Sequence, residues 1–124
     1  MTTYDVTATP ITTADLRKLF AEIDAGEAHL VDVRKELAYR ESGQTVQDAR
    51  RVLPDNVAAW ARSLRPDTKA IVFCVHGHEV SQTAAVTILS HGIYTRYVAG
   101  GFEAIAEACP DRIIPQSPDA EAQI

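Results

Sequence analysis

The chain has 124 residues, of which 46% are hydrophobic and 23% are charged, a composition that indicates one compact globular domain and argues against a disordered, collagen-like or coiled-coil chain. The net charge of -5 disfavours a general binder of nucleic acid or of anionic membranes. The longest apolar run, Ala70 to Val75, has six residues. A membrane-spanning helix needs about twenty, so neither a membrane nor a nucleic acid is an expected partner.

The N-terminus and the cysteines indicate the cellular compartment. Residues 1–5 lack the basic start and the apolar stretch of a secretory signal, so we expect a cytoplasmic protein. In that reducing compartment the two cysteines, Cys74 and Cys109, are not expected to form a disulfide.

The first half of the chain predicts a helix and then a strand. The helix is indicated by four apolar residues at helical spacing: Leu16, Leu19, Phe20 and Ile23. Thr12 or Thr13 could cap its start, and Gly26 could end it. Residues 29–33 are short and rich in branched side chains, which predicts a buried strand.

The next segment is polar and is interrupted by glycine. Residues 34–51 predict mostly loop, with a short helix near residues 36–41. Val52 and Leu53 predict a minimal strand that Pro54 stops.

The second half continues the alternation. Asn56 is expected to cap a helix with apolar positions at helical spacing: Val57, Trp60, Ala61 and Leu64. The continuous apolar run 70–73 predicts a central parallel strand covered on both faces. A helix over 81–91, a strand over 94–98, a tight turn at Gly100–Gly101 and a last helical face ending at Cys109 follow.

These elements predict one α/β domain over residues 1–109, with a central, mainly parallel sheet of about five strands and helices on both faces. Residues 110–124 contain three prolines and many polar side chains. They predict a loosely attached C-terminal tail.

The predicted nucleophile is Cys74, at the end of the central strand. Ligands of open parallel sheets bind beyond the carboxyl ends of the strands. The loop after Cys74 contains Gly77 and leads into a helix, so its amides could form an anion-binding nest that favours a thiolate. Cys109, on the apolar face of the last helix, is predicted to serve packing.

Other polar residues near Cys74 have two interpretations each. His76 and His78 could donate a proton to a leaving group or simply be exposed loop residues, and exposure is favoured for His76. The pattern Cys74-x-His76-x-His78 contains metal-ligand types without an identified fourth ligand, so neither a metal nor another cofactor is predicted. Ser81 is interpreted as a helix cap, because no motif of a serine triad accompanies it.

Four segments together carry a resemblance to a known family: Leu30-Val-Asp-Val-Arg34, Ile71-Val-Phe-Cys74, Ala84-Ala85 with Ile88-Leu89, and Tyr97-Val-Ala-Gly-Gly-Phe102. In this order and spacing, residues 11–108 resemble the rhodanese family of single-domain sulfurtransferases. The resemblance implies that Cys74 takes a sulfane sulfur from thiosulfate or from a persulfide or polysulfide donor. It then holds the sulfur as a persulfide and passes it to a thiol or another thiophilic acceptor.

The resemblance also implies roles for the residues around Cys74. Six loop residues would bind the substrate, and their amides would stabilise the persulfide: Val75, His76, Gly77, His78, Glu79 and Val80. Asp32 and Arg34 would brace this loop through hydrogen bonds, and Ser81 would support it from the following helix.

The loop departs from the family pattern in charge and in length. Val75 replaces the usual arginine after the cysteine, and Glu79 adds a negative charge. Seven positions, 74–80, precede Ser81, which approaches the Cys-x5-Arg loop of related phosphatases and arsenate reductases. Val80 stands where their oxyanion-binding arginine would be, so phosphatase chemistry is disfavoured. The donor could be a less charged persulfide or polysulfide instead of thiosulfate.

Two alternatives to a sulfurtransferase stay open: a non-catalytic rhodanese-like binding or sensing module and, less favoured, an arsenate or chromate reductase.

Arg50 and Arg51 could steer an anionic donor, although a solvated loop is the favoured interpretation. No oligomeric state is predicted.

Overall fold

The computed structural model describes residues 9–76 and 78–116 and shows a five-stranded parallel sheet in the order β1-β6-β5-β2-β4. The strands are β1 (Thr9–Ile11), β2 (His29–Asp32), β4 (Ala49–Arg51), β5 (Lys69–Phe73) and β6 (Tyr94–Val98). The helices are α1 (Leu16–Asp24), α2 (Glu36–Ser42), α3 (Val57–Arg62), α4 (Glu79–Leu89) and α5 (Gly101–Ala108). The predicted α/β fold is confirmed. No helix in these two ranges is long and apolar enough to cross a membrane.

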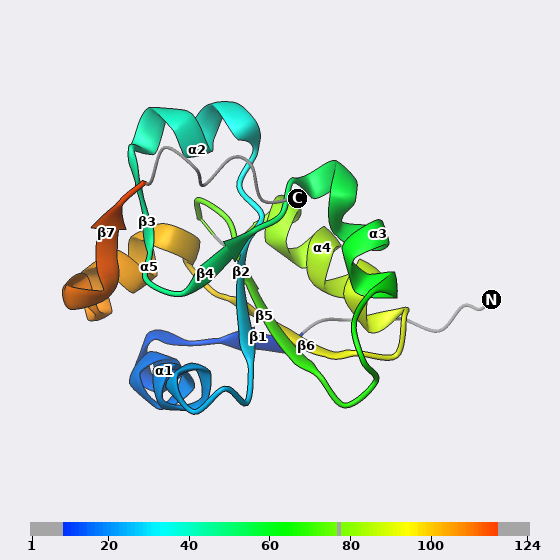
Figure 1. The fold of residues 1–124 in the computed structure, drawn as a ribbon. Helices are drawn as coiled ribbons and strands as arrows, with labels where there is room; N and C mark the ends of the chain where they lie inside the picture. Colours follow the sequence, from blue (N-terminus) through cyan, green and yellow to red (C-terminus); the bar gives the residue numbers. More distant parts are fainter. Residues whose placement is uncertain (1–8, 77, 117–124) are drawn as a thin grey trace.

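The sheet separates two hydrophobic cores, because β5 sends its side chains alternately to both faces. Ala70 and Val72 pack with residues of α3 and α4, whereas Ile71 and Phe73 pack with residues of α1 and α5. Figure 1 shows these two helical layers on opposite sides of the strands, with α2 beyond the end of the sheet. Burial on both faces explains why this strand has a continuous apolar sequence.

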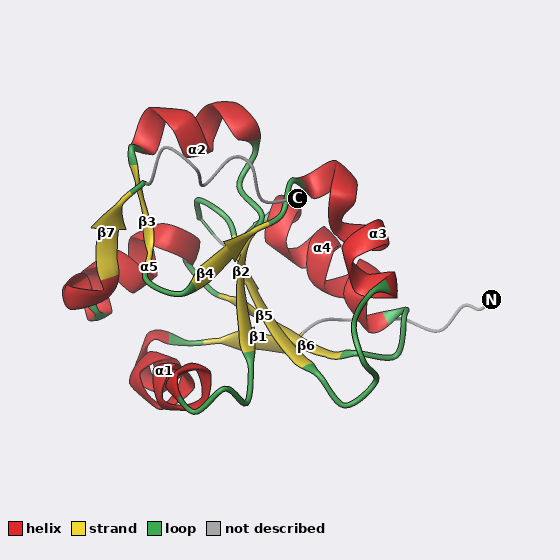
Figure 2. Cartoon of the chain, in the orientation of Figure 1, coloured by secondary structure: helices red, strands yellow, loops and turns green. Residues whose placement is uncertain are grey.

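The same arrangement opens a crevice at the carboxyl ends of the central strands. The chain leaving β5 enters α4 on one face, and the chain leaving β6 enters α5 on the other face (Figures 1 and 2). Where neighbouring strands send their connections to opposite faces, the loops separate and leave room for a ligand.

Helix α1 confirms the first predicted helix, with all four of its apolar residues buried. Its start differs, because a 3-10 turn (Thr13–Asp15) precedes it and Asp15 occupies the N-cap position. Capping by Thr12 or Thr13 is therefore wrong, and the Thr12 hydroxyl donates to the Asp15 carboxylate instead. Gly26 follows the C-cap residue with a φ of 77°, as a helix-ending glycine does.

The region between β2 and α3 contains more structure than predicted. Helix α2 confirms the short helix, but β3 (Gln44–Val46) and β4 were missed. The predicted strand at Val52–Leu53 is wrong, because the strand lies immediately before it. The sequence Ala-Arg-Arg of β4 has no strand pattern, and its backbone pairing with β2 makes it the edge of the sheet.

Two other boundaries differ from the prediction. Helix α4 starts at Glu79 and ends at Leu89, two residues earlier at each end than expected. Helix α3 ends at Arg62 and is preceded by a 3-10 turn (Pro54–Asn56), so Leu64 lies beyond the helix and is half-buried against the same core. Apolar spacing places a helix better than it places its ends.

Residues 110–116 correct the predicted loose tail. They form a 3-10 turn (Pro110–Arg112) and β7 (Ile113–Pro115), which pairs antiparallel with β3. Arg112 forms an ion pair with Asp24 at the end of α1. A two-stranded ribbon depends on backbone pairing, which side-chain periodicity does not reveal. Residues 117–124 of the predicted tail lie outside the described residues.

Candidate active site

Cys74 directly follows β5 and is 5% exposed. Its carbonyl accepts a hydrogen bond from the amide of Phe102 at 2.7 Å, and the Val75 carbonyl accepts one from the amide of Glu103 at 3.4 Å. The first turn of α5 thus holds the start of the loop, and the free amides of a helix N-terminus are used for this purpose.

The predicted glycine turn at Gly100–Gly101 makes this contact possible. Gly100 has a φ of 82°, and a Cβ on it would lie 2.8 Å from the Cβ of Ala104. Glycine is therefore required both by backbone conformation and by space. The turn thus places the first amides of α5 within hydrogen-bonding distance of the carbonyl of Cys74.

A cavity of about 250 Å³ opens beside Cys74. Six residues of the predicted loop line it: Cys74, Val75, His76, His78, Glu79 and Val80. The opposite wall comes from Arg34, Lys35 and Ala38, which lie between β2 and the first turns of α2. Gly77, predicted to allow the sharp turn of the loop, lies outside the described residues.

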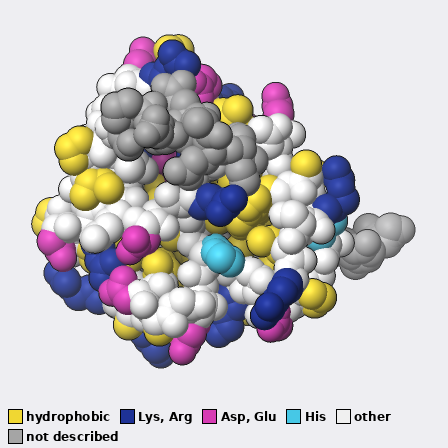
Figure 3. Space-filling view, in the orientation of Figure 1, with side chains coloured by type: hydrophobic (Ala, Val, Ile, Leu, Met, Phe, Trp, Pro, Cys, Tyr) yellow, Lys and Arg dark blue, Asp and Glu magenta, His cyan; other side chains and the backbone are white. Residues whose placement is uncertain are grey.

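The side chains of this loop differ in exposure. His76, His78 and Glu79 are exposed, whereas Val75 and Val80 are half-buried. Val80 forms part of the cavity wall, where it contributes an aliphatic side chain. Figure 3, in the orientation of Figure 1, shows one face of the molecule, on which hydrophobic atoms lie exposed among basic, acidic and histidine side chains.

The two loop histidines have different surroundings. His76 Nδ1 lies 3.2 Å from a carboxylate oxygen of Glu103 on α5, and both side chains are more than half exposed. His78 occupies the N-cap position of α4, and its ring centroid lies 6.1 Å from that of His76. In the part of the chain that the structure describes, no group of three or more His, Cys, Asp or Glu side chains could hold a metal ion.

Asp32 and Arg34 form a buried, two-pronged ion pair behind the loop, with both side chains 1% exposed. Arg34 Nε lies 3.0 Å from Oδ1 of Asp32, and Arg34 Nη2 lies 2.7 Å from Oδ2. The same Nη2 donates to the carbonyl of Gln44 at 2.8 Å. The guanidinium lies 4.5 Å from the ring centroid of Phe102 in α5. The pair thus connects β2, β3 and the helix that holds the Cys74 loop.

Arg51 belongs to the same cluster, so the solvated-loop interpretation is wrong for this residue. It is 5% exposed, donates to the carbonyl of Asp32 at 3.1 Å and stacks 4.2 Å from the ring centroid of Tyr39. It also lies 3.9 Å from a carboxylate oxygen of Asp32 and 3.4 Å from a carboxylate oxygen of Glu36 in α2. The hydrogen bond from Arg40, together with the charges of Arg40 and Arg51, lowers the pKa of Glu36. Arg50, in contrast, is exposed.

Ser81 does not cap α4, because it is the third residue of that helix. Its side chain is buried, and its hydroxyl donates to the carbonyl of His78 at 3.4 Å. Ser81 therefore supports the start of the helix from inside its first turn.

The sequence interpretation missed four neighbours of the site: Lys35, Ala38, Tyr39 and Glu103. Lys35 and Ala38 follow the Asp-Val-Arg segment in an amphipathic turn that could have been placed over the carboxyl end of β2. Glu103 could have been found from Gly100–Gly101, which brings the start of α5 to the same edge of the sheet. No sequence signal assigns Tyr39 to the guanidinium groups.

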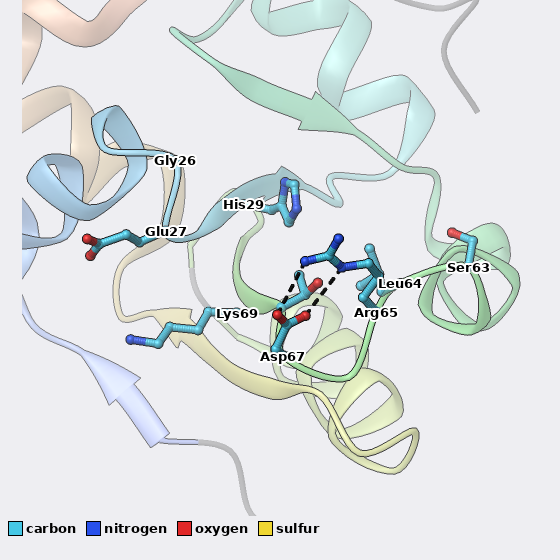
Figure 4. A pocket seen from close by; sticks show the side chains of 9 residues that line it. Gly26, Glu27, His29, Ser63, Leu64, Arg65, Asp67 and Lys69 are labelled. Carbon is cyan, nitrogen blue, oxygen red and sulfur yellow. Dashed lines mark hydrogen bonds and ion pairs between the residues drawn. The ribbon is translucent and has the colours of Figure 1, made fainter.

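A larger cavity of about 550 Å³ lies at the opposite end of the sheet. Figure 4 shows His29 and Lys69, the first residues of β2 and β5, on its wall. Its Arg65 and Asp67 form an exposed ion pair with each other at 3.3 Å. This larger cavity lies at the amino ends of the strands, and no cysteine lines it. The smaller cavity beside Cys74 is therefore the candidate active site.

The comparisons with known proteins agree with this geometry. The Rhodanese-like domain matches residues 15–108. No curated protein matches the chain. Among solved structures, a rhodanese-related protein from Thermoplasma volcanium is 22% identical with a TM-score of 0.67, over 87% of this chain and 99% of that one. The As-Sb reductase from Leishmania major is 16% identical with a TM-score of 0.70, over 91% of this chain and 90% of that one.

A third similar structure is the reduced CoADR-RHD protein of Bacillus anthracis, which is 17% identical with a TM-score of 0.68. The match covers 86% of this chain but only 18% of that longer one. At identities of 16–22%, these structures show only that the fold is shared. The match to the Rhodanese-like domain, in contrast, spans most of the sequence and shows the family. The chain therefore belongs to the family of rhodanese-like domains.

Proposed function

We propose that this chain is a sulfurtransferase that carries a sulfane sulfur on Cys74 between a small-molecule donor and a thiol or other thiophilic acceptor. The observation that carries the proposal is the position of Cys74. Of the two cysteines, Cys74 is the one that directly follows the central strand and lines a cavity at the carboxyl edge of the sheet. Cys109, in contrast, is 2% exposed in the core around α1 and α5.

The reaction has two steps. The Cys74 thiolate attacks the outer sulfur of the donor, a new sulfur–sulfur bond forms, and the donor's own sulfur–sulfur bond breaks. The leaving group is a thiolate from a persulfide or sulfite from thiosulfate, and it departs with the electron pair of the broken bond. An acceptor thiolate then attacks the outer sulfur of the Cys74 persulfide, takes that sulfur and releases the Cys74 thiolate.

The residues around Cys74 have supporting roles in this proposal. Amides of the described loop residues 75, 76 and 78–80 stabilise the negative charge of the persulfide, at the start of α4. The Asp32–Arg34 pair holds the neighbouring backbone in place through Gln44 and Phe102. His78, exposed at the N-cap of α4, can protonate a departing thiolate.

A non-catalytic binding or sensing module is the second candidate. It is favoured by the cavity wall, where the described loop residues 75, 76 and 78–80 include neither lysine nor arginine. Reduction of arsenate or chromate, or phosphate-ester hydrolysis, is less favoured. Val80 offers an oxyanion no bidentate partner at the position where such chemistry needs one.

A matched pair of variants tests the proposal. Cys74→Ser should abolish sulfur transfer to dithiothreitol from every donor, whereas Cys109→Ser should retain it, because Cys109 serves packing only. Circular dichroism spectra should be the same for the two variants. Transfer that survives in Cys74→Ser, or that is lost in a folded Cys109→Ser, would refute the proposed mechanism.

A further inference from the structure

A second cavity adjoins the one beside Cys74. A cavity of about 390 Å³ lies between α4 and the segment formed by the Pro54–Asn56 turn and α3. It shares Lys35, Glu79 and Val80 with the cavity of about 250 Å³ at Cys74. The two cavities are therefore neighbours that meet at these three residues, with Cys74 lining one and Ala58 lining the other. We call the pair of cavities the Val80 groove.

The walls of the Val80 groove are mainly aliphatic. Ala38, Val75 and Val80 line the part near Cys74, and Val57, Ala58 and Ala84 line the distant part. Val57 and Ala84 are buried members of the core shared by α3 and α4. Such a surface stabilises carbon atoms of a ligand and offers little to a fully hydrated anion.

Charged groups border this groove with opposite signs. Lys35 contributes a positive charge where the two cavities meet, and Glu79 contributes a negative charge at the same place. Asp55, at the distant end, adds a second carboxylate. The positive charge of Arg34 is already neutralised by Asp32. The rim thus favours a body that carries both an ammonium and a carboxylate over a compact dianion.

We propose that the sulfur donor is an organic hydropersulfide, R–S–SH, whose carbon body lies in the Val80 groove, and that thiosulfate is disfavoured. This inference rests on the proposed sulfur transfer and specifies its donor. The Cys74 thiolate bonds to the outer sulfur, the sulfur–sulfur bond of R–S–SH breaks, and R–S⁻ leaves with the electron pair. The proton of the outer sulfur passes through His78 to R–S⁻, so R–SH is released and the Cys74 persulfide remains as an anion.

The test fills the distant part of the groove without touching the sulfur. Two variants each place an indole in the second cavity: Ala58→Trp from α3 and Thr83→Trp from α4. The control, Ala59→Trp, places an indole on the exposed side of α3. Rapid quenching and intact mass spectrometry would measure the rate of sulfur addition to Cys74. The donors are glutathione hydropersulfide and inorganic hydrodisulfide, which has no carbon body.

We expect both groove variants to slow addition from glutathione hydropersulfide about tenfold or more, the size of effect that loss of a hydrophobic subsite produces. Addition from inorganic hydrodisulfide should stay unchanged, and Ala59→Trp should alter neither rate. Equal rates with and without the indoles, or equal slowing of both donors, would overturn the groove assignment. Thermal unfolding of each variant would detect any loss of the folded state. Because Thr83 is exposed, we expect at least Thr83→Trp to fold.

Donor preference separates failure of this inference from failure of the proposed function. The wild-type protein should react faster with glutathione hydropersulfide than with thiosulfate, and Glu79→Gln should raise the rate with thiosulfate. If thiosulfate reacts faster, the chain is still a sulfurtransferase and only the donor assignment is wrong. If no donor adds sulfur to Cys74, the proposed function itself fails.

Discussion

Asp32→Asn provides the strongest test of how the site is supported. The carboxylate of Asp32 accepts hydrogen bonds from Nε and Nη2 of Arg34, from the Arg34 amide and from the Thr45 hydroxyl. Asparagine keeps the shape of the Asp32 side chain but removes its negative charge, and its NH₂ group faces N–H groups of Arg34 that are themselves donors. Arg34 then becomes a buried cation without a counter-charge.

The expected loss follows from the burial of this pair. Both side chains are 1% exposed, and removing one partner of such a pair costs about 3–5 kcal/mol of unfolding free energy. With a urea slope of about 1–3 kcal/mol/M for a small domain, the unfolding midpoint should fall by at least about 1 M.

Urea titration followed by the fluorescence of Trp60, the single tryptophan, measures this midpoint, and circular dichroism provides a second probe. The double variant Asp32→Leu/Arg34→Met is the control. A buried pair replaced by apolar residues of similar volume is often neutral, so the double variant should recover part of the loss, although Arg51 then keeps Glu36 as its carboxylate partner without Asp32. A loss of less than about 1 kcal/mol in Asp32→Asn would refute the assignment of an essential buried counter-charge.

Two further predictions concern the frame of the site. The hydrogen bond from Arg112 lowers the pKa of Asp24 below its ordinary value of 3.8. The pair therefore contributes stability above that value and loses it as the pH falls through the lower folded pKa. NMR titration should show the pKa of Asp24 returning to its ordinary value in Arg112→Leu, and an unchanged pKa would contradict the contact. Gly100→Ala should lower stability by about 1–3 kcal/mol, because it forces a side chain into a left-handed conformation against Ala104. Thermal unfolding within error of wild type would show that the turn is free to rearrange.

The sequence predicts the parts of the fold that side-chain burial determines. The strand over residues 94–98 is correct at both ends, and the apolar run 70–73 lacks only Lys69 of the central strand. The strands β4 and β7 could not be predicted, because backbone pairing with a neighbour holds them and their side chains have no strand pattern. Helix ends were displaced for a related reason, since loop paths set them as much as capping residues do.

The candidate site was predictable where local signals coincide. A cysteine at the end of a buried strand, before a glycine loop and a helix, places Cys74 in the crevice of a parallel sheet. The partners of Arg51 and His76 come from other segments of the chain, Tyr39 and Glu103, and only the fold brings them together. A charged residue in a polar segment has no sequence signal that separates a buried cation from a solvated one.

The central claim is that Cys74 carries the sulfur, and peptide mapping after incubation with glutathione hydropersulfide tests it most directly. The account predicts the added mass of one sulfur atom on the peptide that contains Cys74, none on the peptide that contains Cys109, and removal of that sulfur by a thiol acceptor. A folded protein with an accessible Cys74 that gains no sulfur, or gains it only on Cys109, would contradict the account.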